Sequence, residues 1–68
     1  MPENNESPES KAIDSAFSDQ VGTLYRVLVD NLIVAAGSKK SEQQCVERFK
    51  AGLAIARRAR RLASDAIA

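Results

Sequence analysis

The chain has 68 residues, enough for one domain at most, and its 10 basic and 9 acidic side chains leave a net charge of +1. It contains one Cys and no His, which excludes Ser-His-Asp and Cys-His catalytic relays, an internal disulfide and the usual zinc sites. We therefore expect a protein that is not an enzyme and that uses no cofactor, metal or small-molecule substrate.

The shortness of the chain also limits its stability. A domain of this size buries only about 60% of its unfolded surface, and its core rarely supplies more than about 3–5 kcal/mol. Disulfides and histidine-ligated metals cannot make up the difference here. We expect the chain to associate with itself or with a partner instead.

No targeting or membrane segment is expected. Residues 1–10 are acidic and polar, unlike a secretory signal. The longest apolar stretch, residues 24–36, contains Arg26, Asp30 and Asn31, so it is too short and too charged to span a bilayer. A lone Cys fits a reducing compartment. The expected location is the cytoplasm, without membrane association.

The start of the chain differs in composition from the rest. Residues 1–7 have no apolar residue after Met1 and predict a disordered, acidic and polar tail. Ser7 can then cap a helix whose first residue is Pro8, because proline lacks the N–H that a helix start leaves unpaired. Residues 8–68 are predicted to form a single helical domain.

Apolar residues recur after Pro8 with helical spacing. Their steps of 4, 4 and 3 residues repeat after eleven, and this period, about 3.67 residues per turn, favours a nearly straight α-helix. Gly37 follows at the position where helices commonly end. The pattern predicts a first helix over about residues 8–36, with an apolar stripe formed by Ile13, Phe17, Val21, Leu24, Leu28, Leu32 and Ala35.

Gly22 lies in the middle of this predicted helix. An interior glycine weakens a helix by about 1 kcal/mol relative to alanine, and polar residues surround it. The unbroken apolar spacing favours one continuous helix, but the sequence leaves open a break near residues 18–23.

A second helix is predicted over about residues 42–66, after a turn at residues 37–41. Ser41 and Gln44 have the spacing of a capping box, and the following residues are rich in Ala, Arg and Leu without any Pro. A short link between two long helices predicts an antiparallel hairpin.

One face of the second helix consists mostly of small residues, so the first helix can approach it closely. Cys45 belongs to this face and is predicted to pack in the core, with a reactive thiol as the alternative. Ile67 is expected to lie opposite Ile13. The complete face is Cys45, Phe49, Gly52, Ala56, Ala59, Ala63 and Ala66.

The second half of the first helix is apolar around most of its circumference, more than one partner helix can cover. The simplest cover is a second copy, which predicts a homodimer of hairpins forming a four-helix bundle. A different protein partner would satisfy the same surface. The residues predicted to form the oligomer interface are Val27, Val29, Ile33, Val34, Ile55 and Leu62.

The charges are divided unevenly along the chain. Residues 38–68 carry eight Lys or Arg and three acids, a net +5, whereas residues 1–37 carry two and six, a net −4. Lys50, Arg57 and Arg61 are predicted to fall on one outward side of the second helix, with Arg58 further round. These four basic residues are called the arginine face.

Several roles are open for the arginine face. Its guanidinium groups could be simply solvated, or could pair with acids of the first helix such as Asp14 and Asp19. They could also contact the phosphates of RNA or DNA, although no aromatic residues interleave with them to stack bases. An acidic protein or a membrane surface is a weaker alternative.

These features predict a small cytoplasmic protein that acts through helix–helix contacts as a homo-oligomer, in a regulatory or adaptor role. The alternative is a nucleic-acid-binding regulator that uses the arginine face. A third hypothesis is an enzyme subunit that carries no active site of its own.

Overall fold

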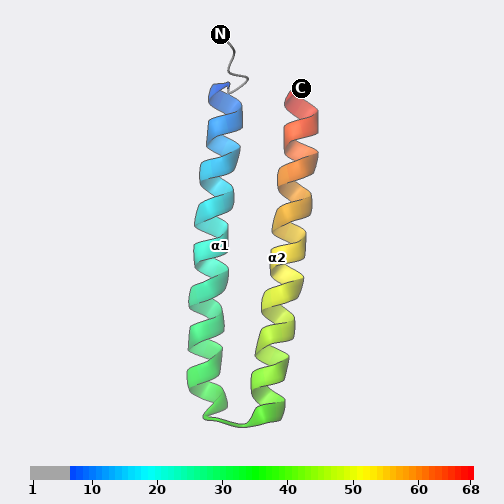
Figure 1. Cartoon of the computed structure of the whole chain (residues 1–68). Helices are drawn as coiled ribbons and strands as arrows, with labels where there is room; N and C mark the ends of the chain where they lie inside the picture. The colour runs from blue at the N-terminus through cyan, green and yellow to red at the C-terminus, as the bar shows by residue number, and fades with distance from the viewer. Residues whose placement is uncertain (1–6) are drawn as a thin grey trace.

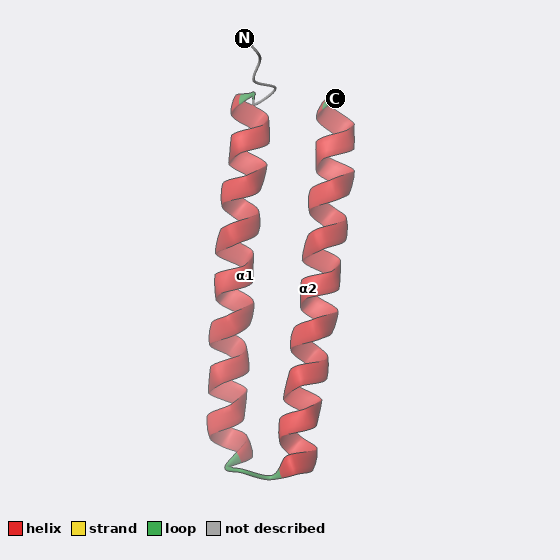
Figure 2. Cartoon of the chain, viewed as in Figure 1, coloured by secondary structure: helices red, strands yellow, loops and turns green. Residues whose placement is uncertain are grey.

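Two long helices account for nearly all of residues 7–68, the part of the chain that the computed structural model describes. Helix α1 spans Pro8–Ala35 and helix α2 spans Lys39–Ile67; they lie side by side and antiparallel (Figure 1). A short turn joins them, and the described residues contain no strand (Figure 2). The predicted all-α hairpin is therefore confirmed. Residues 1–6 of the predicted tail lie outside the described residues.

Helix α1 begins and ends as its sequence predicts. The Ser10 backbone N–H donates to Ser7 Oγ at 3.1 Å, and Pro8 occupies the first turn. At the other end Ala36 adopts a left-handed conformation with φ of 52°, and Gly37 follows with φ of 83°. Two consecutive left-handed residues cannot continue an α-helix, so the chain turns here.

Helix α1 is continuous through Gly22, so the break left open by the sequence does not occur. Thr23, one of the residues consistent with a break, instead donates its hydroxyl to the backbone carbonyl of Asp19 at 3.1 Å. This bond keeps the hydroxyl within the helix rather than drawing the backbone into a turn.

Helix α2 begins at Lys39, three residues earlier than predicted. The N-cap is Ser38, whose Oγ accepts from the Ser41 backbone N–H at 3.4 Å, while the Glu42 N–H donates to the Ser38 carbonyl at 2.8 Å. The predicted capping box at Ser41 and Gln44 was therefore wrong. Both serines have the chemistry of a cap, and the earlier one gives the longer helix.

The register of the hairpin is set by close contacts across the two helices. A β-carbon placed on Gly52 would lie 2.6 Å from Leu24 Cδ2, so the leucine occupies the space that a side chain would need. Further along, the Arg60 guanidinium lies 4.1 Å from the centre of the Phe17 ring. Ala63 and Ile13 line the same groove. Ile67, which was expected opposite Ile13, is 43% exposed.

The predicted stripes face each other, but they bury little. All seven residues of the α1 stripe are half-buried, and among residues 7–68 only Cys45 is fully buried. Ala59 and Ala66, predicted to face α1, are exposed, because they lie at the edge of the α2 stripe and a methyl group does not reach across. The predicted core position of Cys45 is confirmed.

The outcome is a thin rod rather than a globule. Its dimensions are 53 × 16 × 15 Å and its radius of gyration is 15.9 Å, against about 11 Å for a compact domain of this length. No helix in the described part of the chain is long and apolar enough to cross a membrane.

Replacing Gly22 with alanine should stabilise the protein by about 1 kcal/mol, because alanine favours the helix and nothing lies within 4 Å of the added β-carbon. At Gly52 the same change displaces Leu24, which offsets the gain. Gly22→Ala should raise Tm by about 4–8 °C and Gly52→Ala should raise it by less, as measured by thermal unfolding followed by circular dichroism. A lower Tm for Gly22→Ala than for the unmodified chain would contradict its open surroundings.

The two serines before α2 allow a direct test of where this helix begins. Ser38→Ala removes the cap and should lower the free energy of unfolding by about 1 kcal/mol. Ser41→Ala is the matched control and should have a much smaller effect, because only the backbone N–H of Ser41 takes part in the cap. Urea unfolding of both variants measures the difference; a larger loss for Ser41→Ala would place the helix start at the later serine.

Candidate functional site

Large apolar side chains are exposed along both helices. Val34 is 84% exposed, Ile33 71% and Ile55 70%. Of the six residues predicted to form an oligomer interface, only Val29 is half-buried and the others are exposed. Three further exposed residues were not predicted as interface residues: Tyr25, Val46 and Ile67.

Four of these residues share one side of the hairpin. Helical spacing places Val27 and Val34 on one flank of α1 and Ile55 and Leu62 on one flank of α2. Two grooves between the helices place these two flanks next to each other. Val34 of α1 and Arg48 of α2 line the groove nearer the turn. The groove nearer the chain ends is lined by residues of both helices that lie beside the same two flanks. We call this surface, formed by Val27, Val34, Ile55 and Leu62, the apolar face.

The groove near the chain ends is floored by small residues. It has a volume of about 320 Å³, and its α2 wall consists largely of alanines that leave space a larger side chain would fill. The lining residues are Ile13, Ala16, Phe17, Gln20, Ala56, Ala59, Arg60 and Ala63. The groove is thus an apolar depression that no side chain of the hairpin occupies.

Other exposed apolar residues lie away from the apolar face. Tyr25 and Val29 are on the opposite flank of α1, as is Val46 on α2, and we call these three the opposite flank. Tyr25 is 60% exposed and Val46 38%. Ile33 points outward from α1, away from α2. Helical spacing alone places Tyr25 and Val46 on this flank, although neither residue belongs to the oligomer interface predicted from the sequence.

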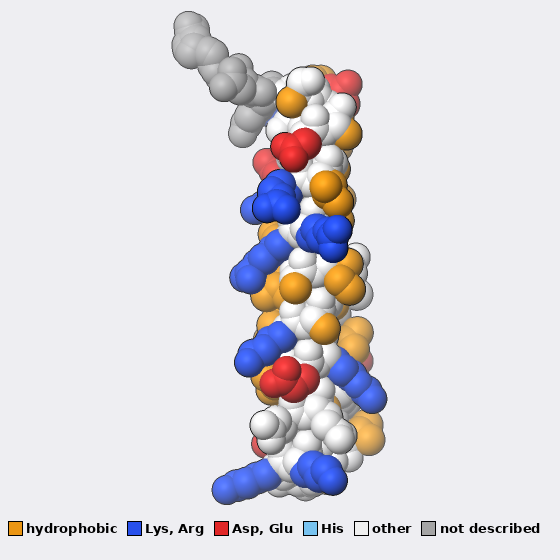
Figure 3. Space-filling model, turned by 90° about the vertical axis from the view of Figure 1, so that its right-hand side faces the viewer, with side chains coloured by type: hydrophobic (Ala, Val, Ile, Leu, Met, Phe, Trp, Pro, Cys, Tyr) orange, Lys and Arg blue, Asp and Glu red, His pale blue; other side chains and the backbone are white. Residues whose placement is uncertain are grey.

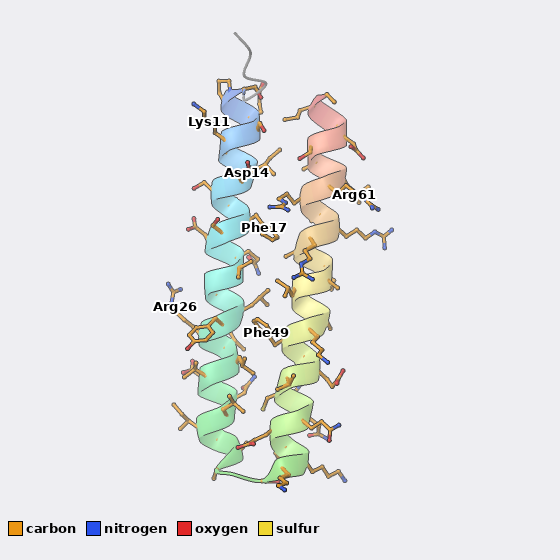
Figure 4. All side chains as sticks on the ribbon, in the orientation of Figure 1. Lys11, Asp14, Phe17, Arg26, Phe49 and Arg61 are labelled. Carbon is orange, nitrogen blue, oxygen red and sulfur yellow. The ribbon has the colours of Figure 1, made fainter. Side chains whose placement is uncertain are left out.

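The aromatic side chains Phe17 and Phe49 point into the space between the helices, whereas Arg26 and Arg61 point away from it (Figure 4). Arg60 is the exception among the clustered arginines, because its guanidinium lies over the Phe17 ring at 4.1 Å. This arrangement is a cation–π contact. Arg60 therefore helps to join the two helices.

The arginine face is exposed along α2. Lys and Arg side chains are spread over much of the side that Figure 3 presents, but not at the end nearest the C-terminus, because the last basic residue of α2 is Arg61. Arg57, Arg58 and Arg61 are all exposed, and with Arg60 and Ser64 they surround a shallow depression. The sequence thus correctly placed these arginines on an outward surface.

The pairing of these arginines with acids of α1 is not formed. Within residues 7–68 one ion pair occurs, between Lys50 Nζ and Glu47 Oε2 at 3.9 Å, and both of its side chains are about two-thirds exposed. Exposed pairs of this kind contribute little to stability. Because the arginines of the arginine face point away from α1, their charges remain unpaired by the described residues.

No group of three or more metal-ligating side chains comes together in residues 7–68. Comparison with known proteins gives no match to a family model, a curated protein or a solved structure. The apolar face and the arginine face are the two surfaces of the described chain that are suited to binding a partner.

The cation–π contact gives a prediction with a matched control. Arg60→Ala should lower the free energy of unfolding by about 0.5–1 kcal/mol, because it removes the guanidinium from the Phe17 ring. Arg61→Ala removes the same charge and similar side-chain mass from a position without such a contact, so it should change stability little. Urea unfolding of the two variants makes the comparison. Equal losses would contradict a stabilising role for the ring contact.

Proposed function

We propose that the chain is a helix–helix interaction module that assembles as a homodimer, with its apolar face as the interface. The observation that carries this proposal is the near absence of a core: one residue of the described chain is fully buried, while eight large apolar side chains are 38–84% exposed. Apolar surface of this extent marks an interaction site.

The dimensions of the rod fit a second copy. Each helix is about 42 Å long and the rod is about 16 Å wide, so one side offers roughly 700 Å² in projection. A stable interface buries about 800 Å² from each partner. A second hairpin of the same length covers the apolar face from end to end and supplies the core that one hairpin lacks.

The two halves of the apolar face complement each other. Val27 and Val34 protrude in the half nearer the turn, whereas the half nearer the chain ends combines the alanine-lined groove with the protruding Ile55 and Leu62. A two-fold axis that sets the copies end for end brings the valines of each copy toward the groove of the other. No acidic side chain lines either groove, and each groove has one arginine, Arg60 or Arg48, whose charge must stay at the solvent edge of the contact. The product is a four-helix bundle.

A regulatory or adaptor role follows from what such a dimer still presents. Tyr25, Val29 and Val46 on the opposite flank remain uncovered when the apolar face is occupied, and a different protein can bind there. The arrangement requires no catalytic group. We therefore infer a non-enzymatic role in the cytoplasm, in which the dimer acts by binding other proteins.

The homodimer is tested by sedimentation equilibrium at micromolar concentration, which should give twice the chain mass of 7.4 kDa. Ile55→Lys should raise the dissociation constant at least about 100-fold: each buried isoleucine contributes about 1.5–3 kcal/mol, and a two-fold interface loses two. Ala54→Lys adds the same charge on the exposed, outward side of α2 and should leave the dimer intact.

Two results would contradict this proposal. The first is a helical monomer at all micromolar concentrations, which would leave the apolar face to a different partner. The second is an equal rise in the dissociation constant for Ile55→Lys and Ala54→Lys, which would show that the apolar face does not form the interface.

A further inference from the structure

The arginine face carries an excess of positive charge that the described chain does not neutralise. Helix α2 contains eight Lys or Arg and three acidic side chains, and the one ion pair within residues 7–68 uses Lys50 and Glu47. Arg57, Arg58 and Arg61 have no acidic atom of the described residues within 4.0 Å.

The spacing of these arginines adds to the electrostatic cost. Arg57 lies four residues before Arg61, and Arg58 lies three residues before it, so their side chains are neighbours on the helix surface. Like charges at these spacings destabilise a helix. An external anion that lies between them removes this repulsion, and the depression that they surround gives it a place to bind.

The shape of the face favours an extended anion over a compact one. Lys50 and Arg61 are eleven residues apart on one continuous helix, a distance of about 16 Å along the axis. Lys39 and Lys40 continue the positive charge to the start of α2. A duplex carries a phosphate charge about every 1.7 Å of its axis, so a polyphosphate backbone can follow a row of this length.

We propose that the arginine face binds the phosphate backbone of nucleic acid. The planar guanidinium groups of Arg57, Arg58 and Arg61 donate hydrogen bonds to phosphate oxygens, which they match in geometry. Lys50 adds a fourth positive charge when it exchanges its exposed ion pair with Glu47 for a phosphate. Because the face has no aromatic residue to stack on bases and sits on a straight helix, it recognises the backbone rather than the sequence.

A membrane fits this surface less well. The large apolar side chains of α2 occur on its flanks, whereas the outward side between Lys50 and Arg61 has only Ala54 to insert into lipid. Lys50, Arg57 and Arg61 lie on a different side of α2 from Ile55 and Leu62, so they can hold nucleic acid while a second copy is bound. Arg58 lies between the two sides, three residues after Ile55 and four before Leu62.

The proposal is tested by fluorescence anisotropy, with the full chain titrated into a labelled duplex DNA and a labelled single-stranded RNA at several salt concentrations. Four phosphate contacts predict that log K falls with log salt with a slope of about −3.6 for duplex DNA. Arg57→Gln/Arg61→Gln should reduce this slope to about −1.8 and weaken binding roughly 50-fold at about 0.1 M salt.

The matched control is Lys11→Gln/Arg26→Gln, which removes two positive charges from exposed positions on α1. It should leave the slope and affinity nearly unchanged; circular dichroism checks that both double variants remain helical. Absence of binding at about 0.1 M salt would overturn the proposal, as would equal losses in both variants. Binding to acidic peptides or anionic vesicles, with none to DNA or RNA, would overturn it too.

Discussion

Two antiparallel helices can cover only one stripe of each other, and the rest of this structure depends on that limit. The seven apolar residues of the α1 stripe all face α2, yet each stays half-buried. Cys45 of α2 is the one fully buried residue between Ser7 and Ala68. Adding length to such a hairpin adds exposed surface as fast as contact. A third and fourth helix would enclose a core, and in the proposed dimer a second copy supplies both at once.

The separation of charge and apolar surface on α2 gives the chain two independent sides. Ile55 and Leu62 lie on one flank, whereas Arg57, Arg58 and Arg61 point outward. Arg60 stacks on Phe17 and so helps to hold the two helices together. The outward arginines make no such contact with the described part of the chain and are free to bind a partner. A dimer through the apolar face leaves two arginine faces exposed, which would double the number of phosphate contacts available to one polyanion.

Helical periodicity predicted most of the fold, because it reports directly which residues point the same way. It placed the end of α1 within one residue of its observed position and put Cys45 in the core, whereas it favoured but did not settle the continuity of α1 through Gly22. The start of α2 was less predictable, since Ser38 and Ser41 offer the same capping chemistry and only the path of the turn selects between them. The register of the two helices also needed the structure, which fixes it through the contact of Leu24 with Gly52 and of Arg60 with Phe17. Likewise, the sequence could not distinguish arginines paired with α1 from unpaired ones, because that depends on the direction of each side chain.

The central claim is that the hairpin is incomplete without a second copy, and the concentration dependence of thermal unfolding tests it most directly. Mass action makes the stability of an obligate dimer depend on protein concentration. Circular dichroism melts over a hundredfold range of concentration should show Tm rising steadily, with helicity lost at the lowest concentrations. A cooperative melt whose Tm is the same at every concentration would show a hairpin that is stable alone, and would contradict the account.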